Sequence, residues 1–345
     1  MNLEPVAIVG ASGYSGEELV RLLSRHPGVE LVALTSRQLA GQTVETVFPK
    51  FAGLRYAHLA FIESDVEKIL ATGARFVFLA LPHGVAAEFA QPLVAAGVRV
   101  IDLSADFRIK DPAVYQEFYG EAQPAPELAA TSVYGLPEIY REQIRTAKLV
   151  ASPGCYPTSV IVPLYPLLKS RLLERESLVI NSLSGVSGAG RNARVDLLFA
   201  ECNESVRAYG VPKHRHLGEI EQELSNAYGD TVTVSFAPHL IPVNRGIATT
   251  IHARPAAGVG MGEIANALRA AYAEEPFIRL LGENGNADTK NVTFTNFVDI
   301  AWRHDPRTGR VILLSAEDNL VKGAAGQAVQ ALNVMCGWPE TTALL

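Results

Sequence analysis

The stretch Gly10-Ala11-Ser12-Gly13-Tyr14-Ser15-Gly16 decides how the first half of this chain folds. An apolar run at residues 5–10 precedes it and predicts a strand, while Leu19, Leu22 and Leu23 predict one face of a helix after it. A second strand is expected at residues 30–35. Glycines between a strand and a helix let the backbone approach a pyrophosphate, which the N–H groups of the helix N-terminus bind. The sequence therefore predicts a dinucleotide site.

The glycine spacing is G-x-x-G-x-x-G, a variant of the usual G-x-G-x-x-G, and a plain glycine-rich turn is the competing interpretation. The second strand ends in Thr35-Ser36-Arg37, without the acid that usually binds the ribose hydroxyls of NAD. Ser36 and Arg37 would suit the extra phosphate of NADP, unless Arg37 is only a solvated loop residue. NADP is the expected cofactor, and the loop residues expected to bind it are Gly10, Ser12, Gly13, Tyr14, Ser15 and Gly16.

Strands expected at residues 76–81 and 98–103 continue the alternation with helices, and ligands bind beyond the carboxyl ends of such strands. Pro82 and His83 follow the first of them and are expected near the cofactor, although His83 could equally serve only its own loop. Arg108 follows the second and is expected either to anchor an anionic substrate or to pair with Asp106. Residues 110–144 are expected to be irregular.

The stretch Ser152-Pro153-Gly154-Cys155-Tyr156-Pro157-Thr158 joins a strand expected at residues 148–151 to an apolar helix. Proline is favoured in a first helical turn, which places Cys155 at or beside the helix N-terminus. Free N–H groups and the positive end of the helix dipole stabilise a thiolate there. Cys155 is therefore a candidate nucleophile, with a metal ligand or a buried cap as the local alternatives.

Polar–apolar alternation in the second half predicts a mixed, largely antiparallel sheet, with strands at residues 178–183, 231–237, 246–252, 291–301 and 310–314. The fold class is α/β: a Rossmann-type dinucleotide domain plus an α+β catalytic and oligomerisation domain. The glycine-rich loop after Leu183 is expected to pack on cofactor or substrate through Ser184 and Gly185, rather than to form a second phosphate cradle.

His214 and His216 come just before a helix with Leu217, Ile220 and Leu224 on one face, so they can reach into a cleft. Histidine is the natural general acid or base at neutral pH and a frequent partner of a catalytic cysteine. A zinc site with Cys155 would need a further ligand that the spacing does not supply, and no metal is expected. Purely structural histidines are the remaining alternative.

The C-terminal segment from Asp318 leads through small residues into a helix expected to return to the nucleotide domain, with Asn319 near the cofactor. The expected domains are residues 1–154 with 318–345, and residues 155–317. Cys202 and Cys336 have no base or helix start beside them and are expected to be inert.

Composition excludes several classes of protein. The 345 residues are 48% hydrophobic and 19% charged, as in a globular protein with two domains. A net charge of −6 and no basic patch argue against nucleic-acid binding, and no stretch predicts a signal peptide or a membrane span. Three distant cysteines form no disulfide or zinc pattern, so we expect a cytoplasmic protein with reduced thiols.

Together the sequence motifs resemble those of the N-acetyl-gamma-glutamyl-phosphate reductase family, of the aspartate-semialdehyde dehydrogenase-like superfamily. The resemblance spans nearly the whole chain; beyond the two stretches already quoted, it rests on Ser104-Ala-Asp-Phe-Arg108, Ser184-Gly-Val-Ser-Gly-Ala-Gly-Arg191, His214-Arg-His216 and Lys322-Gly-Ala-Ala-Gly-Gln327. One departure is Ser159, where the family more often has Gly or Ala.

The resemblance implies an NADPH-dependent oxidoreductase of arginine biosynthesis that converts N-acetyl-gamma-glutamyl phosphate to the semialdehyde and phosphate through a cysteine thioester. It implies Cys155 as nucleophile and His216, or else His214, as acid/base. It also places Arg108, His214 and Ser152 on the substrate and predicts a homo-oligomer, dimer or tetramer. The rivals are the homologous reductase of an aminoadipate phosphate in lysine biosynthesis, a catalytically silent NADP-binding protein, and a cysteine hydrolase.

Overall fold

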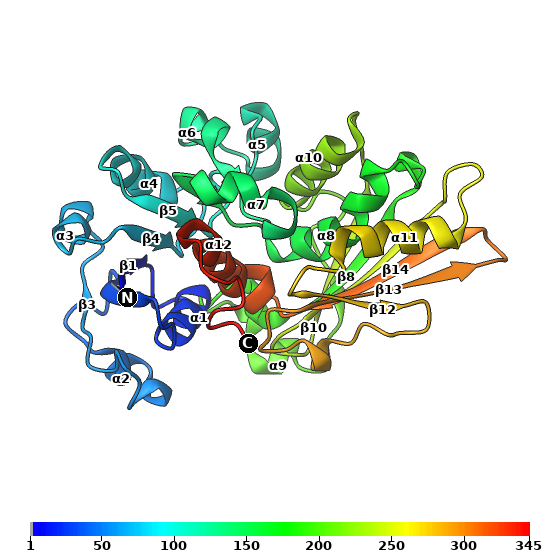
Figure 1. Ribbon diagram of the computed structural model, residues 1–345. Coiled ribbons are helices and arrows are strands. Elements are labelled where there is room, and N and C mark those ends of the chain that lie inside the picture. The colour runs from blue at the N-terminus through cyan, green and yellow to red at the C-terminus, as the bar shows by residue number, and fades with distance from the viewer. Residues whose placement is uncertain (1–2) are drawn as a thin grey trace. The chain divides into compact units, whose positions relative to one another are not determined.

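The computed structural model describes residues 3–345, and its internal contacts divide the chain into two units (Figure 1). Unit 1 contains the chain as far as Ala113, Ala122–Pro153 and Ala324–Leu345. Unit 2 contains Val114–Glu121 and Gly154–Gly323. The excursion at Val114–Glu121 was not expected from the sequence. It joins unit 2 through Lys213, which pairs with Glu117 at 3.1 Å and lies 5.3 Å from the centre of the Phe118 ring.

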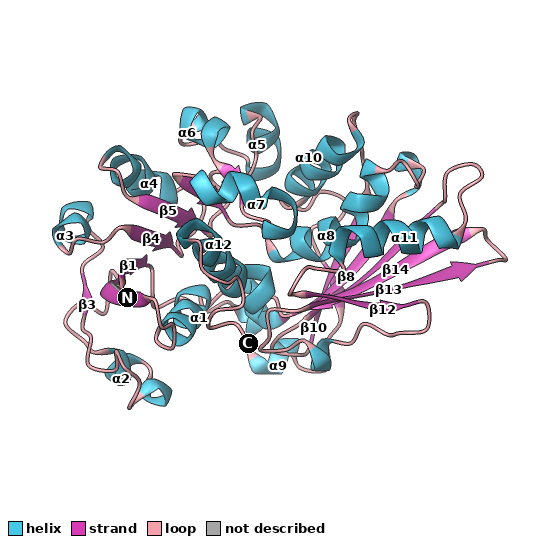
Figure 2. Ribbon diagram, viewed as in Figure 1, coloured by secondary structure: helices cyan, strands magenta, loops and turns pink. Residues whose placement is uncertain are grey.

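Unit 1 is built on a seven-stranded sheet with the order β3-β2-β1-β4-β5-β7-β6, in which every pairing is parallel (Figure 2). This is the predicted Rossmann-type architecture. The strands are β1 (Glu4–Val9), β2 (Val29–Thr35), β3 (Phe61–Ile62), β4 (Phe76–Leu79), β5 (Arg99–Asp102), β6 (Val133–Tyr134) and β7 (Leu149–Ala151).

Helix α12 (Gly326–Cys336) belongs to the same unit as the glycine loop, because it contacts α1 (Tyr14–Leu23), α7 (Pro137–Thr146) and β5. The other helices of unit 1 include α2 (Val44–Val47), α3 (Val66–Ala71), α4 (Ala86–Ala95) and α6 (Pro126–Thr131). A short π-helix at Val321–Ala325 leads into α12.

The expectation that residues 110–144 are irregular is wrong. Helices α5 (Pro112–Tyr119), α6 and α7 occupy much of that stretch. Each begins with a proline, whose missing N–H is not needed in a first turn and whose fixed φ suits a helix. The prolines therefore start these helices instead of breaking them.

Unit 2 is a seven-stranded mixed sheet with the order β12-β13-β14-β11-β8-β10-β9. Four of its six pairings are antiparallel, whereas β10 with β8 and β12 with β13 are parallel. This confirms the predicted mixed, largely antiparallel sheet. The strands are β8 (Val179–Gly185), β9 (Arg207–Ala208), β10 (Ser235–Ile241), β11 (Ile247–Ala253), β12 (Ile278–Gly282), β13 (Val298–Asp305) and β14 (Arg310–Glu317).

Helix α8 (Cys155–Lys169) is the centre of unit 2. It contacts α10 (Leu217–Tyr228), α11 (Met261–Tyr272), β11 and β14, and all but a few of its side chains are buried. A short helix, α9 (Phe199–Cys202), follows the loop after β8.

Two predicted strands begin later than expected. The strand expected at residue 231 begins at Ser235, because the N–H groups of Val232 and Val234 donate to side chains of α10 rather than to a neighbouring strand. The strand expected at residue 291 begins at Val298, and the N–H of Phe294 donates to the Asp318 carboxylate at 2.7 Å. Side-chain acceptors thus replace the sheet ladder at the first place, and at the second they do so together with turn hydrogen bonds such as that from Thr293 N–H to the Thr289 carbonyl.

The glycine loop leaves no room for side chains at its two ends. Gly10 has φ +81°, a conformation that favours glycine. A Cβ on Gly16 would lie 2.4 Å from the Gly10 carbonyl oxygen, whereas a Cβ on Gly13 would have that oxygen as its nearest neighbour at 3.7 Å. Gly16 therefore serves close helix packing, while Gly13 leaves space above the loop.

We predict that Gly16→Ala lowers the free energy of unfolding by about 1–3 kcal/mol, because the added methyl overlaps the backbone. Gly13→Ala is the matched control and should change it by less than about 0.5 kcal/mol. Denaturant unfolding without nucleotide measures both variants. Equal midpoints for the two variants would contradict the packing role of Gly16.

Candidate active site

Cys155 is the first residue of α8, directly after the N-cap residue Gly154. Its side chain is half-buried. The N–H of Gly154 donates to Oε1 of the buried Glu219, in the first turn of α10, at 2.8 Å. The starts of α8 and α10 are thereby joined beside the thiol.

The chain after β14 passes closely over the base of Cys155. A Cβ on Gly323 would lie 2.7 Å from Cβ of Cys155 and 3.0 Å from Oε1 of Glu317. Only glycine fits there. The prediction that small residues in this segment allow close backbone packing is confirmed.

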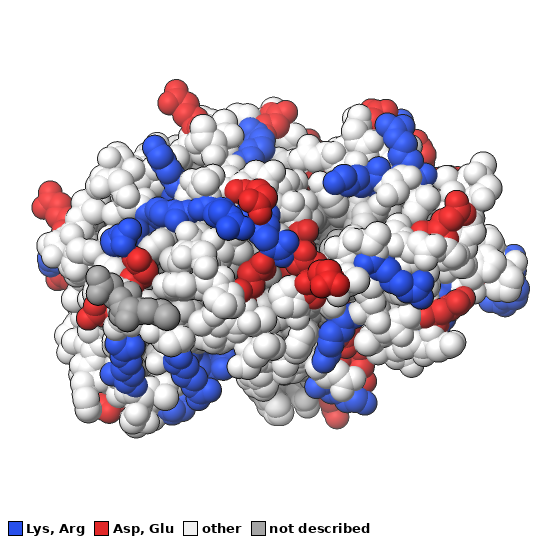
Figure 3. Space-filling view, in the orientation of Figure 1, with Lys and Arg blue, Asp and Glu red and all other residues white. Residues whose placement is uncertain are grey.

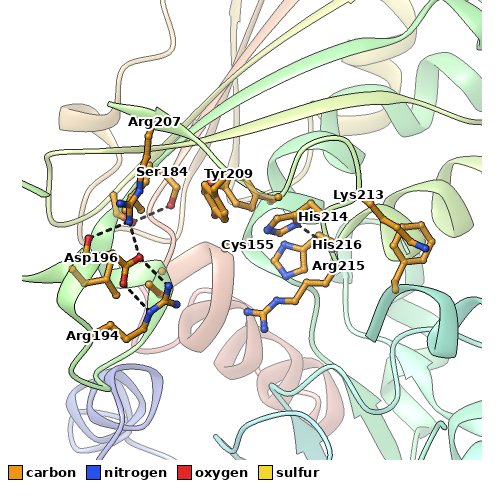
Figure 4. A pocket seen from close by; sticks show the side chains of 18 residues that line it. Cys155, Ser184, Arg194, Asp196, Arg207, Tyr209, Lys213, His214, Arg215 and His216 are labelled. Carbon is orange, nitrogen blue, oxygen red and sulfur yellow. Dashed lines mark hydrogen bonds and ion pairs between the residues drawn. The ribbon is translucent and has the colours of Figure 1, made fainter. Parts of the chain in front are cut away.

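Cys155 opens into a pocket of about 590 Å³ in unit 2 (Figure 4). Both histidines, Ser184 and Gly185 line the same pocket, so five residues selected from the sequence come together there. Four of the five Lys, Arg, Asp and Glu side chains that line the pocket are basic. On the surface seen in Figure 3, in contrast, side chains of both signs are interspersed. Sequence reasoning missed four of its polar lining residues, namely Arg194, Asp196, Arg207 and Tyr209.

Tyr156 is the centre of an aromatic cluster at this pocket. Its ring centre lies 5.6 Å from that of His214 and 5.9 Å from that of His216, both edge-on. Tyr209 donates its hydroxyl to that of Tyr156 at 2.9 Å, and Tyr156 donates to the carbonyl of His239 at 3.3 Å. Burial raises the pKa of both phenols, that of Tyr209 to about 12, so both remain protonated at neutral pH.

The two histidines differ in their surroundings. Burial, with a contribution from the charge of Arg215, lowers the pKa of His214 to about 4. The N–H of His216 donates to Nδ1 of His214 at 3.2 Å, so a neutral His214 carries its proton on Nε2. His216 is the N-cap residue of α10, and its ring centre lies 4.9 Å from that of His214.

The loop predicted to bind a dinucleotide is tied to the end of β2. Ser12 and Ser36 share a hydrogen bond between their hydroxyls at 3.1 Å, and the N–H of Ala11 donates to the Thr35 carbonyl at 3.0 Å. Tyr14 and Ser15 form the first turn of α1.

Arg37 is exposed, and within residues 3–345 its guanidinium has no ion pair or hydrogen bond. The space above Gly13 and the N-terminus of α1 fit the pyrophosphate of a dinucleotide.

Pro82 and His83 form an exposed turn after β4. Asp106 accepts the N–H of Gly84 at 2.7 Å and that of Ala87 at 3.2 Å, so its carboxylate organises the turn that carries His83. The sequence had offered Asp106 as a partner for Arg108.

Arg108 is buried, with Nε donating to the carbonyl of Ser152 at 2.7 Å and Nη2 to that of Leu103 at 2.7 Å. It holds the segment just before Cys155. The hydroxyl of Ser152 is buried and has no hydrogen-bond partner among the described residues. A role for either side chain on substrate stays a prediction.

Asn319 lies in unit 2, where its amide donates to the Ser187 hydroxyl at 2.9 Å and accepts the Gly246 N–H at 2.8 Å. It thereby supports the loop that follows Ser184 and Gly185.

Cys336 is half-buried, and burial raises the pKa of its thiol to about 12, which makes it a poor nucleophile. In the part of the chain that the structure describes, no group of three or more potential ligands could hold a metal ion, and no helix is long and apolar enough to cross a membrane.

Two family models match the chain. The model described as "Semialdehyde dehydrogenase, NAD binding domain" matches residues 5–147, and "Semialdehyde dehydrogenase, dimerisation domain" matches residues 155–319. The first covers the glycine loop and β2. The second covers the entire pocket except Phe118.

Curated relatives match over nearly their full length. An N-acetyl-gamma-glutamyl-phosphate reductase of Akkermansia muciniphila is 61% identical, with 98% of each chain covered. A protein of the same name from Pelotomaculum thermopropionicum is 50% identical, over 98% of this chain and 97% of the relative. Among solved structures, aspartate semialdehyde dehydrogenase II of Vibrio cholerae aligns with a TM-score of 0.74 at 19% identity, covering 98% of this chain and 99% of that chain. That likeness concerns the fold.

The lowered pKa of His214 predicts how stability depends on pH. The unfolded histidine titrates near 6.5, so between about pH 6.5 and pH 4 the unfolded chain binds one more proton than the folded chain. The free energy of unfolding must therefore fall as the pH falls through that window. His214→Asn, which keeps an acceptor for the His216 N–H, should remove about 2 kcal/mol of the loss between pH 7 and pH 5.

Denaturant unfolding at the two pH values measures this difference. The exposed His304 offers a control that has no side-chain hydrogen bond or ion pair among the described residues, and His304→Asn is compared with His214→Asn at both pH values. An unchanged dependence in His214→Asn would show that His214 titrates normally in the folded protein.

Proposed function

The chain belongs to the N-acetyl-gamma-glutamyl-phosphate reductase family, and from that premise we propose that it reduces N-acetyl-gamma-glutamyl phosphate with NADPH. The products are N-acetyl-L-glutamate 5-semialdehyde, NADP and phosphate, and the pathway is arginine biosynthesis. The observation that carries the proposal is the position of Cys155, at a helix N-terminus in a pocket with two histidines and four cationic side chains. The names of the curated relatives supply the substrate.

The proposed chemistry is covalent catalysis by Cys155. Its thiolate attacks the acyl carbon, the bond from that carbon to the phosphate oxygen breaks, and phosphate leaves a thioester on the protein. A bound nicotinamide dinucleotide supplies the hydride that reduces the acyl group. The carbon–sulfur bond then breaks to release the aldehyde and regenerate the thiol. N–H groups at the start of α8 favour negative charge developing on the carbonyl oxygen.

His216 is the proposed acid/base. His214 is neutral at pH 7, because its pKa is about 4, and its Nδ1 already accepts the N–H of His216. His214 therefore positions the start of α10, while the His216 ring at the pocket can give a proton to the departing oxygen and take one from the thiol.

The proposed preference for NADP over NAD rests on the end of β2. Ser36 is held beside the glycine loop by Ser12, and Arg37 has no competing partner among the described residues. An Arg at this position accommodates a 2′-phosphate. Pro82, His83, Ser184, Gly185 and Asn319 are proposed as further cofactor contacts, and Arg108 and Ser152 as substrate contacts.

We also propose that the enzyme is a homo-oligomer, dimer or tetramer, assembled through the sheet of unit 2. The family model that matches this unit is described as a dimerisation domain. In the first half of β14 the alternate residues Arg310, Ile312 and Leu314 are half-buried, and two of these three side chains are apolar and available to a second copy. A cytoplasmic location is proposed because Cys155 must remain a reduced thiol.

The reverse reaction tests the substrate and the nucleophile together. Semialdehyde, NADP and phosphate should yield NADPH, measured by absorbance. Cys155→Ser should remove nearly all turnover while NADPH binding is kept, because a serine hydroxyl is a far weaker nucleophile without activation. Cys336→Ser, which alters the half-buried cysteine of unit 1, should retain wild-type turnover.

Activity retained in Cys155→Ser would refute the nucleophile. Equal turnover of aspartate semialdehyde or of the aminoadipate homologue would refute the substrate assignment, since a pocket that recognises chain length separates compounds that differ by one methylene by about 1–3 kcal/mol.

A charge reversal tests the preference for NADP. Arg37→Glu should weaken NADPH binding at least about tenfold and leave NADH nearly unaffected, because only NADPH carries the 2′-phosphate. Fluorescence titration of both cofactors measures the effect, with Arg25→Glu on the exposed surface of the same unit as the control. Equal losses for the two cofactors would show that Arg37 is a solvated loop residue.

A further inference from the structure

Helix α8 contains two interior prolines, and the hydrogen bonds that they remove are replaced from outside the helix. Pro163 has no N–H, so the carbonyl of Ser159, four residues earlier, lacks its usual partner within the helix. The hydroxyl of Ser315, in β14, donates to that carbonyl at 2.6 Å. Tyr272 of α11 compensates for Pro166 in the same way, because its hydroxyl donates at 2.7 Å to the carbonyl four residues before that proline. The interior of α8 is thus tied to the sheet and to α11.

A row of hydroxyl side chains in the sheet faces Ser159. Ser182 of β8, Thr249 of β11 and Ser315 of β14 lie on three neighbouring strands, and Thr249 is the cross-strand partner of both serines. The Thr249 hydroxyl lies 2.7 Å from that of Ser182 and 2.8 Å from that of Ser159. All four side chains are at most 2% exposed. Ser159, Ser182, Thr249 and Ser315 together form the hydroxyl cluster.

The hydrogen bonds between these hydroxyls run in one direction. Ser159 donates its only hydroxyl proton to the carbonyl of Tyr156 at 2.9 Å, so toward Thr249 it acts as the acceptor. Thr249 then has no proton left for Ser182 and accepts from it. The series of donors therefore begins in β8 and ends in the first turn of α8, at the residue after Cys155.

The hydroxyl cluster is directional, whereas the rest of the contact between α8 and the sheet is not. Most other buried side chains of α8 are apolar, and apolar contacts tolerate small displacements along the helix axis. A buried hydroxyl is costly when it loses its partner, so a helix that slid or turned would break the cluster at a cost. Ser159 is also the residue at which this chain departs from the more usual Gly or Ala, neither of which has a hydroxyl.

We propose that the hydroxyl cluster sets the axial position of α8 and thereby positions Cys155 for nucleophilic attack, an inference that rests on the proposed function. Ser159 and Thr249 are the positioning residues. Cys155 lies about one helical turn before Ser159, so a displacement at Ser159 is passed directly to the thiol. The N–H groups of a helix start stabilise a thiolate only over a short range, and a misplacement of about 1 Å can slow a reaction severely.

Two substitutions of Thr249 separate its hydroxyl from its methyl group. Thr249→Val keeps the shape of the side chain and removes the hydroxyl, whereas Thr249→Ser keeps the hydroxyl and removes the methyl. Alkylation with iodoacetamide at pH 7, resolved by peptide mass spectrometry, measures the reactivity of Cys155. Thr249→Val should slow this alkylation at least about threefold, because less of the thiol is held as thiolate. Thr249→Ser should stay within about twofold of the wild-type rate.

The reverse reaction gives a second measurement of the same variants. Thr249→Val should lower kcat at least about fivefold and change KM for the semialdehyde less than about twofold, because the cluster acts on the thiol and not on substrate binding. Ser159→Ala should lower kcat as well. The double variant should lose less than the product of the two single losses, because both substitutions break the same hydrogen bond.

Ser170→Ala is the matched control. Ser170 is the C-cap residue of the same helix, and its exposed hydroxyl has no hydrogen bond among the described residues, so this variant should keep both wild-type rates. Cys202 is half-buried in the same unit and should react at its wild-type rate in every variant, which separates an effect on Cys155 from unfolding.

Wild-type alkylation of Cys155 in Thr249→Val would overturn the inference. Equal losses in Thr249→Val and Thr249→Ser would also overturn it, since they would assign the effect to packing, as would parallel changes at Cys155 and Cys202. Failure of the wild-type enzyme to turn over the semialdehyde would instead overturn the proposed function, and the alkylation rates would still decide whether the cluster positions the thiol.

Discussion

The hydrogen bond from Gly154 N–H to the Glu219 carboxylate is the interaction on which the active site depends. Both residues are buried, and a buried polar group is costly unless it is hydrogen-bonded. The N–H at a helix start is a suitable partner because it has no acceptor within its own helix. The bond joins the starts of α8 and α10, and these starts carry Cys155 and His216. The nucleophile and the proposed acid/base are thus positioned by backbone geometry rather than by flexible side chains.

Close packing constrains the same region further. Gly323 allows the segment after β14 to lie against Cys155, and Gly185 has no room for a side chain because Asn244 and Arg245 lie 2.8 Å from its ideal Cβ position. At both glycines the backbone therefore packs directly against its neighbours. Closely packed backbone moves little, so the specificity of the pocket is set by the side chains that line it.

Sequence reasoning found the features whose signal is local. The glycine loop, the cysteine at a helix start and most strands follow from short patterns of glycine, proline and apolar residues. It failed where tertiary structure supplied the backbone partners. Val232 and Val234 look like strand residues, yet their N–H groups donate to α10. Pro112, Pro126 and Pro137 look like breakers, yet each starts a helix.

The cationic wall of the pocket could not be found in that way. Arg194, Asp196 and Arg207 lie in a stretch without periodicity, and they come together because β9 pairs with the edge of the sheet. The spacing Arg-x-Asp is the one local signal, since the two side chains are near enough in sequence to pair with each other. It indicates an ion pair but not the pocket that the pair faces.

The His214-Arg215-His216 triplet shows how position separates two identical side chains. The ring of His214 is surrounded by those of Tyr156, Tyr209 and Phe236, where burial opposes protonation, and the charge of Arg215 opposes it further. A neutral His214 keeps a lone pair on Nδ1 for the N–H of His216, so the absence of charge on one histidine fixes the backbone of the other. If His214 were protonated, both of its nitrogens would be donors and that hydrogen bond would be lost. The low pKa of His214 is therefore a structural requirement for the position of His216.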